Sequence, residues 1–176
     1  MAGETEDIES LELLVMRHAK SDWSTYSSDF DRPLNQRGVR NAKQMAQWLA
    51  DHGTEPDRVL SSPAARARTT ALEVVAACGI DEAEVEFDEE LYLADAWTWL
   101  TKLQAQKGAR LLICGHNPGL DQLVDHLSGG SAPFSDSGKL MTTAAIAHFA
   151  HGPTWSALGT AEGWIRLISL TRPRDL

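Results

Sequence analysis

Short apolar runs alternate along this chain with longer segments in which apolar residues recur every three or four positions. The runs have the length of buried strands, and we expect strands at 11–16, 58–62, 85–87, 111–114, 144–150 and 164–170. The longer segments predict helices at 37–52, 64–78 and 94–106, and from Asn117-Pro118 to about Leu127. This alternation predicts an α/β fold, a three-layer sandwich with a mostly parallel central sheet flanked by helices. We expect a single domain over residues 11–176.

Residues at the predicted helix ends support these boundaries. Ser62 followed by Pro63 is the expected N-terminal cap of the second helix. Gly53 and Gly79 are expected to end the first and second helices. In the third helix Trp97 shares the spacing of the apolar residues, which predicts that it packs inward.

Composition limits the possible partners and location. With 16 Lys and Arg against 25 Asp and Glu, the net charge of −9 would repel a polyphosphate backbone, so nucleic acid is not an expected partner. No apolar run approaches the roughly 18 residues that a membrane span needs, so we expect no membrane partner. Residues 1–10 are acidic, unlike a signal peptide, and are expected to form a flexible tail. These observations favour a cytoplasmic location.

Polar residues follow three of the predicted strands, where ligands bind in open α/β sheets. They are Arg17-His18, Ser61-Ser62 with Arg66 in the next helical turn, and Gly115-His116-Asn117. The guanidinium groups of Arg17 and Arg66 match phosphate oxygens bidentately. The helices after Ser62 and Asn117 present free backbone N–H groups to an anion. The sequence therefore predicts a binding site for a dianion.

Two histidines indicate which reaction this site could carry out. The neighbouring arginines disfavour the protonated form of His18, which leaves a neutral imidazole able to attack phosphorus. His116 is expected to donate to the phosphoryl oxygens, whose charge must be stabilised in the transition state. The sequence lacks the usual spacings of metal ligands and the arginines would repel a cation, so neither a metal nor another cofactor is expected.

Four motifs carry a resemblance to a known family. They are residues 15–23 (VMRHAKSDW), 32–34 (RPL) with Gly38, 61–70 (SSPAARARTT) and 114–120 (CGHNPGL). In this order they resemble the histidine phosphatase superfamily, and more closely its small SixA-like phosphohistidine phosphatases. The resemblance runs from about Leu13 to about Ala147. It implies a phosphoglycerate mutase-like fold, a phosphohistidine intermediate on His18 and a phosphate pocket of Arg17, Arg66 and His116.

Further residues are assigned by their positions in these motifs. Ser21 and Asn117 are expected near the phosphate pocket. Lys20 and Arg32 either line its mouth or form ion pairs on the surface.

The general acid is left open by the sequence. Mutase and acid phosphatase members carry a larger insertion between Glu89 and Leu111, which supplies a proton donor and a lid, whereas this chain has one short predicted helix there. Glu90, Asp22 and Asp31 are the candidates for the acid. A site without lid or acid suits an exposed substrate with a good leaving group, and phosphohistidine on a protein meets both conditions.

The resulting hypothesis is a metal-independent phosphohydrolase with a phosphohistidine enzyme intermediate, acting on a phosphorylated histidine protein. One alternative is a phosphatase of a small phosphorylated metabolite, such as a sugar or nucleotide phosphate. A second is a non-catalytic module that binds phosphate or phosphoprotein. The intact set of Arg17, His18, Arg66 and His116 argues against the second alternative.

Overall fold

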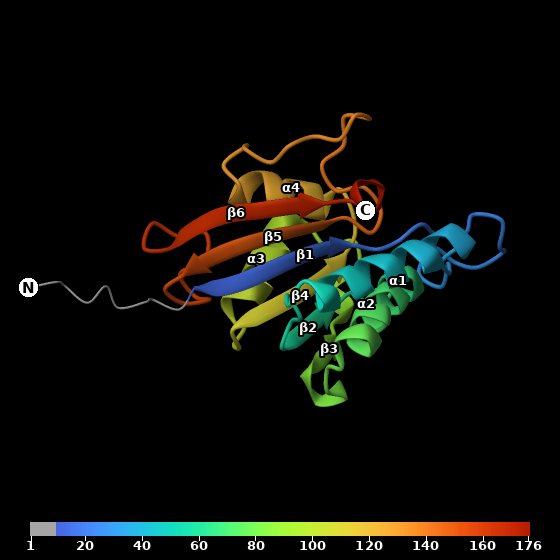
Figure 1. Ribbon diagram of the computed structural model, residues 1–176, viewed down its shortest axis with the longest axis horizontal. Coiled ribbons are helices and arrows are strands. Elements are labelled where there is room, and N and C mark those ends of the chain that lie inside the picture. Colours follow the sequence, from blue (N-terminus) through green and yellow to red (C-terminus); the bar gives the residue numbers. More distant parts are fainter. Residues whose placement is uncertain (1–9) are drawn as a thin grey trace, which may run out of the picture.

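The computed structural model describes residues 10–176 and contains one six-stranded sheet (Figure 1). Its strands are β1 (Leu11–Arg17), β2 (Arg58–Ser61), β3 (Val85–Phe87), β4 (Arg110–Gly115), β5 (Ile146–Gly152) and β6 (Trp164–Thr171). The spatial order is β3-β2-β4-β1-β5-β6. The first four strands are parallel, whereas β5 and β6 pair antiparallel. This topology confirms the predicted, mostly parallel sheet. The predicted tail lies outside the described residues, except for Ser10.

Within residues 10–176, four α-helices cover the two faces of the sheet (Figure 1). They are α1 (Gln36–Asp51), α2 (Ala65–Cys78), α3 (Ala96–Gln104) and α4 (Gly119–Leu127). Apolar side chains of α1 and α2 pack against one face of the sheet, and those of α3 and α4 pack against the other. Three short 3-10 helices also occur, at Glu82–Glu84, Glu89–Leu91 and Pro173–Asp175. The predicted three-layer sandwich is confirmed.

The predicted cap of α2 is wrong. The helix begins at Ala65 and its N-cap is Ala64, which makes no side-chain capping bond. The Ser62 hydroxyl lies two residues before that cap, where it accepts from the backbone nitrogen of Ala64 over 3.3 Å and lies 2.8 Å from Nε2 of His116. Ser62 therefore orders the turn before α2 and contacts His116, but it is not the N-cap residue.

The expected inward packing of Trp97 is also wrong. Trp97 is 64% exposed, whereas Trp99 is fully buried. The buried face of α3 consists of Trp99, Leu100 and Leu103. Since residues two positions apart point to different sides of a helix, burial of Trp99 turns Trp97 toward solvent.

The parallel strands bring the predicted site residues to one edge of the sheet. Arg17 at the end of β1 pairs in register with Gly115 at the end of β4, and Ser61 at the end of β2 pairs with Cys114. The residues that follow these strands therefore meet in space. Within residues 10–176, no helix is long and apolar enough to cross a membrane.

Candidate active site

A cavity of about 340 Å³ lies beyond the carboxyl ends of β1 and β4 and beside the first turn of α2. All residues that the sequence suggested as catalytic or substrate-binding line it: Arg17, His18, Lys20, Ser21, Arg32, Arg66, His116 and Asn117. They come from four separate segments of the chain. The fold therefore gathers them into one place.

His18 is buried and its ring is held in one orientation. Its Nδ1 lies 2.7 Å from the carbonyl oxygen of Ala19, and the backbone nitrogen of Ala19 donates to the hydroxyl of Thr70 in α2. A neutral imidazole that donates from Nδ1 keeps its lone pair on Nε2. Burial first, and then the charges of His116, Arg17 and Arg66, lower the pKa of His18 to about 3, although the hydrogen bond to the Ala19 carbonyl raises it. His18 is therefore neutral at pH 7, and burial contributes more to this than the like charge that the sequence suggested.

His116 lies next to His18, with 5.2 Å between the two ring centroids. Its Nε2 pairs with the hydroxyl of Ser62, whereas its Nδ1 is buried without a hydrogen-bond partner among the described residues. Burial, followed by the charge of Arg66, lowers the pKa of His116 to about 4. The site therefore holds two adjacent neutral imidazoles at pH 7.

Two of the arginines meet at Asp29. Arg66, which is 3% exposed, donates to the backbone oxygen of Asp29 over 2.6 Å and to its carboxylate over 3.1 Å. Arg32 donates to the other carboxylate oxygen over 2.8 Å and also to the hydroxyl of Ser21. Arg32 thus both lines the cavity and forms an ion pair, the two alternatives that the sequence left open.

Several residues that line this cavity have a buried polar atom without a hydrogen-bond partner. Within the described part of the chain, the Nε atoms of Arg17, Arg32 and Arg66 are buried and unpartnered, as is Nδ1 of His116, and all four residues line the cavity. A buried donor left without an acceptor costs roughly 1–3 kcal/mol. Because guanidinium groups only donate, the missing partner is an acceptor. An anion with several oxygens, such as a phosphoryl group, fits this requirement.

Sequence reasoning missed Asp29 and Tyr92. The Asp29 carboxylate accepts from the Tyr92 hydroxyl as well as from both arginines, and these contacts, that of Tyr92 first, hold its pKa well below the usual range. Asp29 is therefore ionised and has no proton to donate at neutral pH. Its loop shows no periodicity, so no pattern in the sequence places its side chain beside Arg66.

The structure brings none of the three general-acid candidates to the cavity. Glu90 forms an ion pair with Lys102 over 2.8 Å. Asp22 accepts from the backbone and hydroxyl of Ser24, and Asp31 accepts from the hydroxyl of Ser28. Each carboxylate is satisfied by a surface neighbour, and none is among the residues that line the cavity.

Within residues 10–176, no group of three or more His, Cys, Asp or Glu side chains is placed to hold a metal ion.

Comparisons with known proteins agree with this fold. Residues 13–95 match the model of the histidine phosphatase superfamily (branch 1). An uncharacterised chloroplastic protein of Arabidopsis thaliana is 33% identical over 93% of this chain and 78% of its own length. Phosphohistidine phosphatase SixA of Escherichia coli K12 is 31% identical over 78% of this chain and 83% of its own length. The chain therefore belongs to the histidine phosphatase superfamily.

Within that superfamily the chain is SixA-like. It is similar to a solved structure of the protein histidine phosphatase SixA complexed with tungstate, with a TM-score of 0.75 and 28% identity over 94% of this chain and 99% of that one. A mycobacterial glucosyl-3-phosphoglycerate phosphatase has a TM-score of 0.63 at 14% identity, covering 90% of this chain and 97% of that one, which shows the shared fold alone. Membership of the superfamily and similarity to SixA support phosphatase activity.

Proposed function

We propose that the chain is a phosphohydrolase that transfers a phosphoryl group to His18 and then to water, and that its substrate is phosphohistidine on a protein. The observation that carries this proposal is the set of unpartnered arginine N–H donors, with the unpartnered Nδ1 of His116, around the neutral, oriented imidazole of His18. The similar SixA structure contains tungstate, a tetrahedral oxyanion with the shape of phosphate, which supports an anion in this cavity. The cytoplasmic location stays a prediction.

The geometry suggests how the first transfer proceeds. The lone pair on Nε2 of His18 attacks phosphorus while the arginine N–H groups hold the non-bridging oxygens. The new N–P bond places positive charge on the ring, and the Nδ1–H bond to the carbonyl of Ala19 stabilises that charge. The substrate's P–N bond breaks with its electron pair returning to nitrogen. If the other ring nitrogen of the substrate carries a proton, the product is neutral imidazole.

The second transfer releases the phosphate. Water attacks the phosphorus bound to His18, the N–P bond breaks, and the imidazole regains its lone pair on Nε2. The water proton goes to the departing phosphate or to solvent. The described residues thus suffice for both steps when the leaving group needs no separate acid, as is the case for protonated phosphohistidine.

The test is mass spectrometry of the enzyme after rapid mixing and a mild quench that preserves phosphohistidine. The enzyme is mixed with a phosphorylated histidine protein, with phosphoramidate, or with p-nitrophenyl phosphate as the control ester. We expect a transient phosphate on His18 and faster P–N than P–O cleavage. The adduct should be absent in His18→Ala and present in the matched control His52→Ala, since His52 is exposed at the end of α1.

Other results would contradict the proposal in different ways. An adduct formed only from esters would keep the mechanism but move the substrate to a small metabolite. Undiminished turnover by His18→Ala would exclude His18 as the nucleophile. Phosphate binding without adduct or release would identify a binding module.

A further inference from the structure

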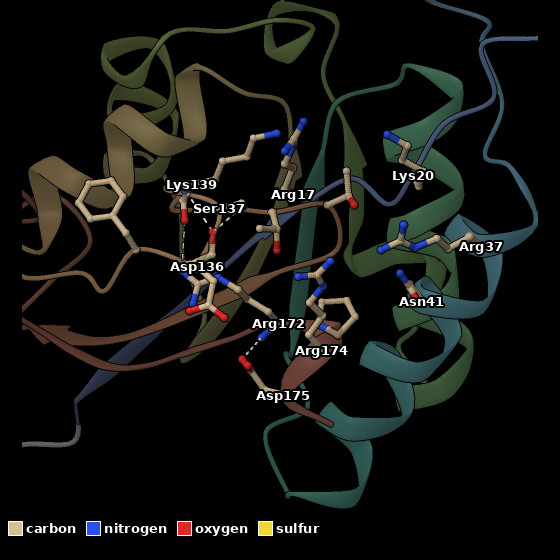
Figure 2. A pocket seen from close by; sticks show the side chains of 15 residues that line it. Arg17, Lys20, Arg37, Asn41, Asp136, Ser137, Lys139, Arg172, Arg174 and Asp175 are labelled. Atoms are coloured by element: carbon tan, nitrogen blue, oxygen red, sulfur yellow. Dashed lines mark hydrogen bonds between the residues drawn. The ribbon is translucent and has the colours of Figure 1, made fainter.

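A second cleft of about 330 Å³ adjoins the candidate active site (Figure 2). The loop at 134–143, the C-terminal segment at 172–175 and the first turns of α1 enclose it. Arg17, Lys20 and Thr143 line both this cleft and the catalytic cavity, so the two spaces are adjacent. A macromolecular substrate bound at His18 can therefore also contact the lining of the second cleft. We call this second space the basic cleft.

The lining of the basic cleft is strongly positive. Its six basic and two acidic side chains contrast with the net charge of −9 of the whole chain. The basic side chains are Arg17, Lys20, Arg37, Lys139, Arg172 and Arg174. Figure 2 shows Arg37 and Arg174 directed into the space between α1 and the C-terminal segment, while Lys139 extends toward Arg17. The cleft therefore concentrates positive charge on an acidic protein.

Most of these cations have no structural partner. Arg172 has a structural role, because its guanidinium donates to the backbone oxygens of Pro133 and Leu140. Apart from Arg17 and Arg172, the basic side chains of the cleft form neither an ion pair nor a hydrogen bond with any residue in 10–176. They are Lys20, Arg37, Lys139 and Arg174. These four are exposed, so their charge is available to a ligand.

Exposed apolar side chains border the same two spaces. Phe134 lines the basic cleft and is 64% exposed, while Trp23 and Leu93 line the catalytic cavity and are 74% and 55% exposed. Such groups contribute binding free energy only when a partner covers them, and a macromolecular surface covers more of them than a small metabolite does. Unpaired cations beside exposed aromatic groups fit an acidic protein surface that also carries apolar residues.

We propose that the basic cleft docks acidic side chains of the phosphorylated protein while its phosphohistidine occupies the catalytic cavity. This inference rests on the proposed function and specifies its substrate. The attraction between the basic cleft and acidic side chains acts only at short range. The net charge of −9 repels an acidic partner at long range, and salt screens interactions between charges beyond about 8 Å at physiological ionic strength. Acidic residues within a few positions of the phosphohistidine are therefore the recognised feature.

The experiment compares three phosphohistidine peptides of equal length whose flanking residues are Glu, Gln or Lys. For the wild-type chain we expect kcat/KM to fall in the order Glu, Gln, Lys, with a smaller spread at 0.5 M salt. The double charge reversal R37E with R174E should lower kcat/KM for the Glu peptide about tenfold or more. It should leave hydrolysis of p-nitrophenyl phosphate unchanged, because neither residue lines the catalytic cavity.

Arg40→Glu is the matched control. Arg40 is exposed on α1, one turn after Arg37, and does not line the basic cleft. The Arg40→Glu substitution reverses a charge on the same helix but should preserve the preference for the Glu peptide. Thermal unfolding of each variant checks that the fold is intact.

Three results would overturn the inference. These are equal kcat/KM for the three peptides, an equal loss in Arg40→Glu, or a larger loss on fructose 1,6-bisphosphate than on the Glu peptide. The last result would assign the cleft to a second phosphate of a metabolite. If an adduct on His18 still forms from phosphoramidate, the docking inference alone has failed; if no P–N bond is cleaved, the proposed function has failed with it.

Discussion

Arg66 and Arg68 lie two residues apart on α2 but have different surroundings. Arg66 is buried in the catalytic cavity, whereas Arg68 is exposed, with its guanidinium 4.2 Å from the ring centroid of Phe87. We expect Arg66→Ala to lower kcat/KM for p-nitrophenyl phosphate by at least a hundredfold, about 3 kcal/mol of transition-state stabilisation. Arg68→Ala should leave it nearly unchanged, and a greater loss in Arg68→Ala would contradict the assignment of Arg66 to the phosphate.

At the scale of single residues, the sequence predicts members of the site better than the contacts between them. The motifs place His18 and His116 directly after β1 and β4, and Arg66 in the first turn of the helix after β2, so parallel pairing brings the three together. Asp29 and Tyr92 are 63 positions apart and lie in segments without periodicity, so no pattern predicts their hydrogen bond. Burial, the largest cause of the lowered pKa of His18, likewise depends on the complete fold.

At the scale of elements, hydrophobic periodicity predicts the described strands and α-helices approximately, and it predicts the first residues of β1, β2, β3 and β6 correctly but not that of β5. The predicted strand at 144–150 begins instead at Ile146, because Ala144 has a φ of 64°, which no strand residue adopts. The errors at Ser62 and Trp97 have a similar origin. The chain enters α2 two residues after Ser62, and burial of Trp99 sets the rotation of α3; neither is visible in a local pattern.

Gly38 in α1 packs closely against the backbone of Lys20, in the loop after β1. A Cβ at Gly38 would lie 2.0 Å from the carbonyl oxygen of Lys20. Ala normally stabilises a helix interior by about 1 kcal/mol relative to Gly. Here we expect Gly38→Ala to lower the free energy of unfolding by about 1–3 kcal/mol, as overpacking does, and to raise KM by displacing the backbone at Lys20 and Ser21.

Urea unfolding and steady-state kinetics measure both effects. Gly53→Ala is the control, since Gly53 has a φ of +65° and nothing lies within 4 Å of the added Cβ. It should cost stability through local backbone strain and leave KM unchanged. A gain in stability for Gly38→Ala would show that the close approach to Lys20 is absent.

At the scale of the whole molecule, three buried histidines make stability depend on pH. Burial lowers the pKa of His18 to about 3 and those of His116 and His151 to about 4. In the unfolded chain these groups bind protons below about pH 6.5, whereas in the folded chain they stay neutral. The unfolded state therefore binds more protons, and the free energy of unfolding falls as pH falls from about 6.5 toward 4.

His151 provides the test of this dependence. It is fully buried, its ring contacts Trp155, and both its nitrogens lack hydrogen-bond partners among residues 10–176. We expect His151→Leu to remove up to about 1.4 kcal/mol per pH unit of the wild-type slope below pH 6.5. Urea unfolding at pH 7.5 and 5 measures the difference. Equal slopes in the two proteins would contradict neutral burial of His151, and activity at pH 7.5 should not change.

The central position of β1 has a consequence for folding during synthesis. Leu13 in β1 pairs with Leu111 in β4 and with Phe149 in β5. At about 5–20 residues per second, a ribosome needs on the order of ten seconds between making β1 and making β5. Just before β5 is made, the chain already contains Arg17, His18, Arg66 and His116. The edge of β1 that will pair with β5 is still unpaired at that point. Such high contact order predicts slow folding and a transient aggregation-prone edge in the nascent chain.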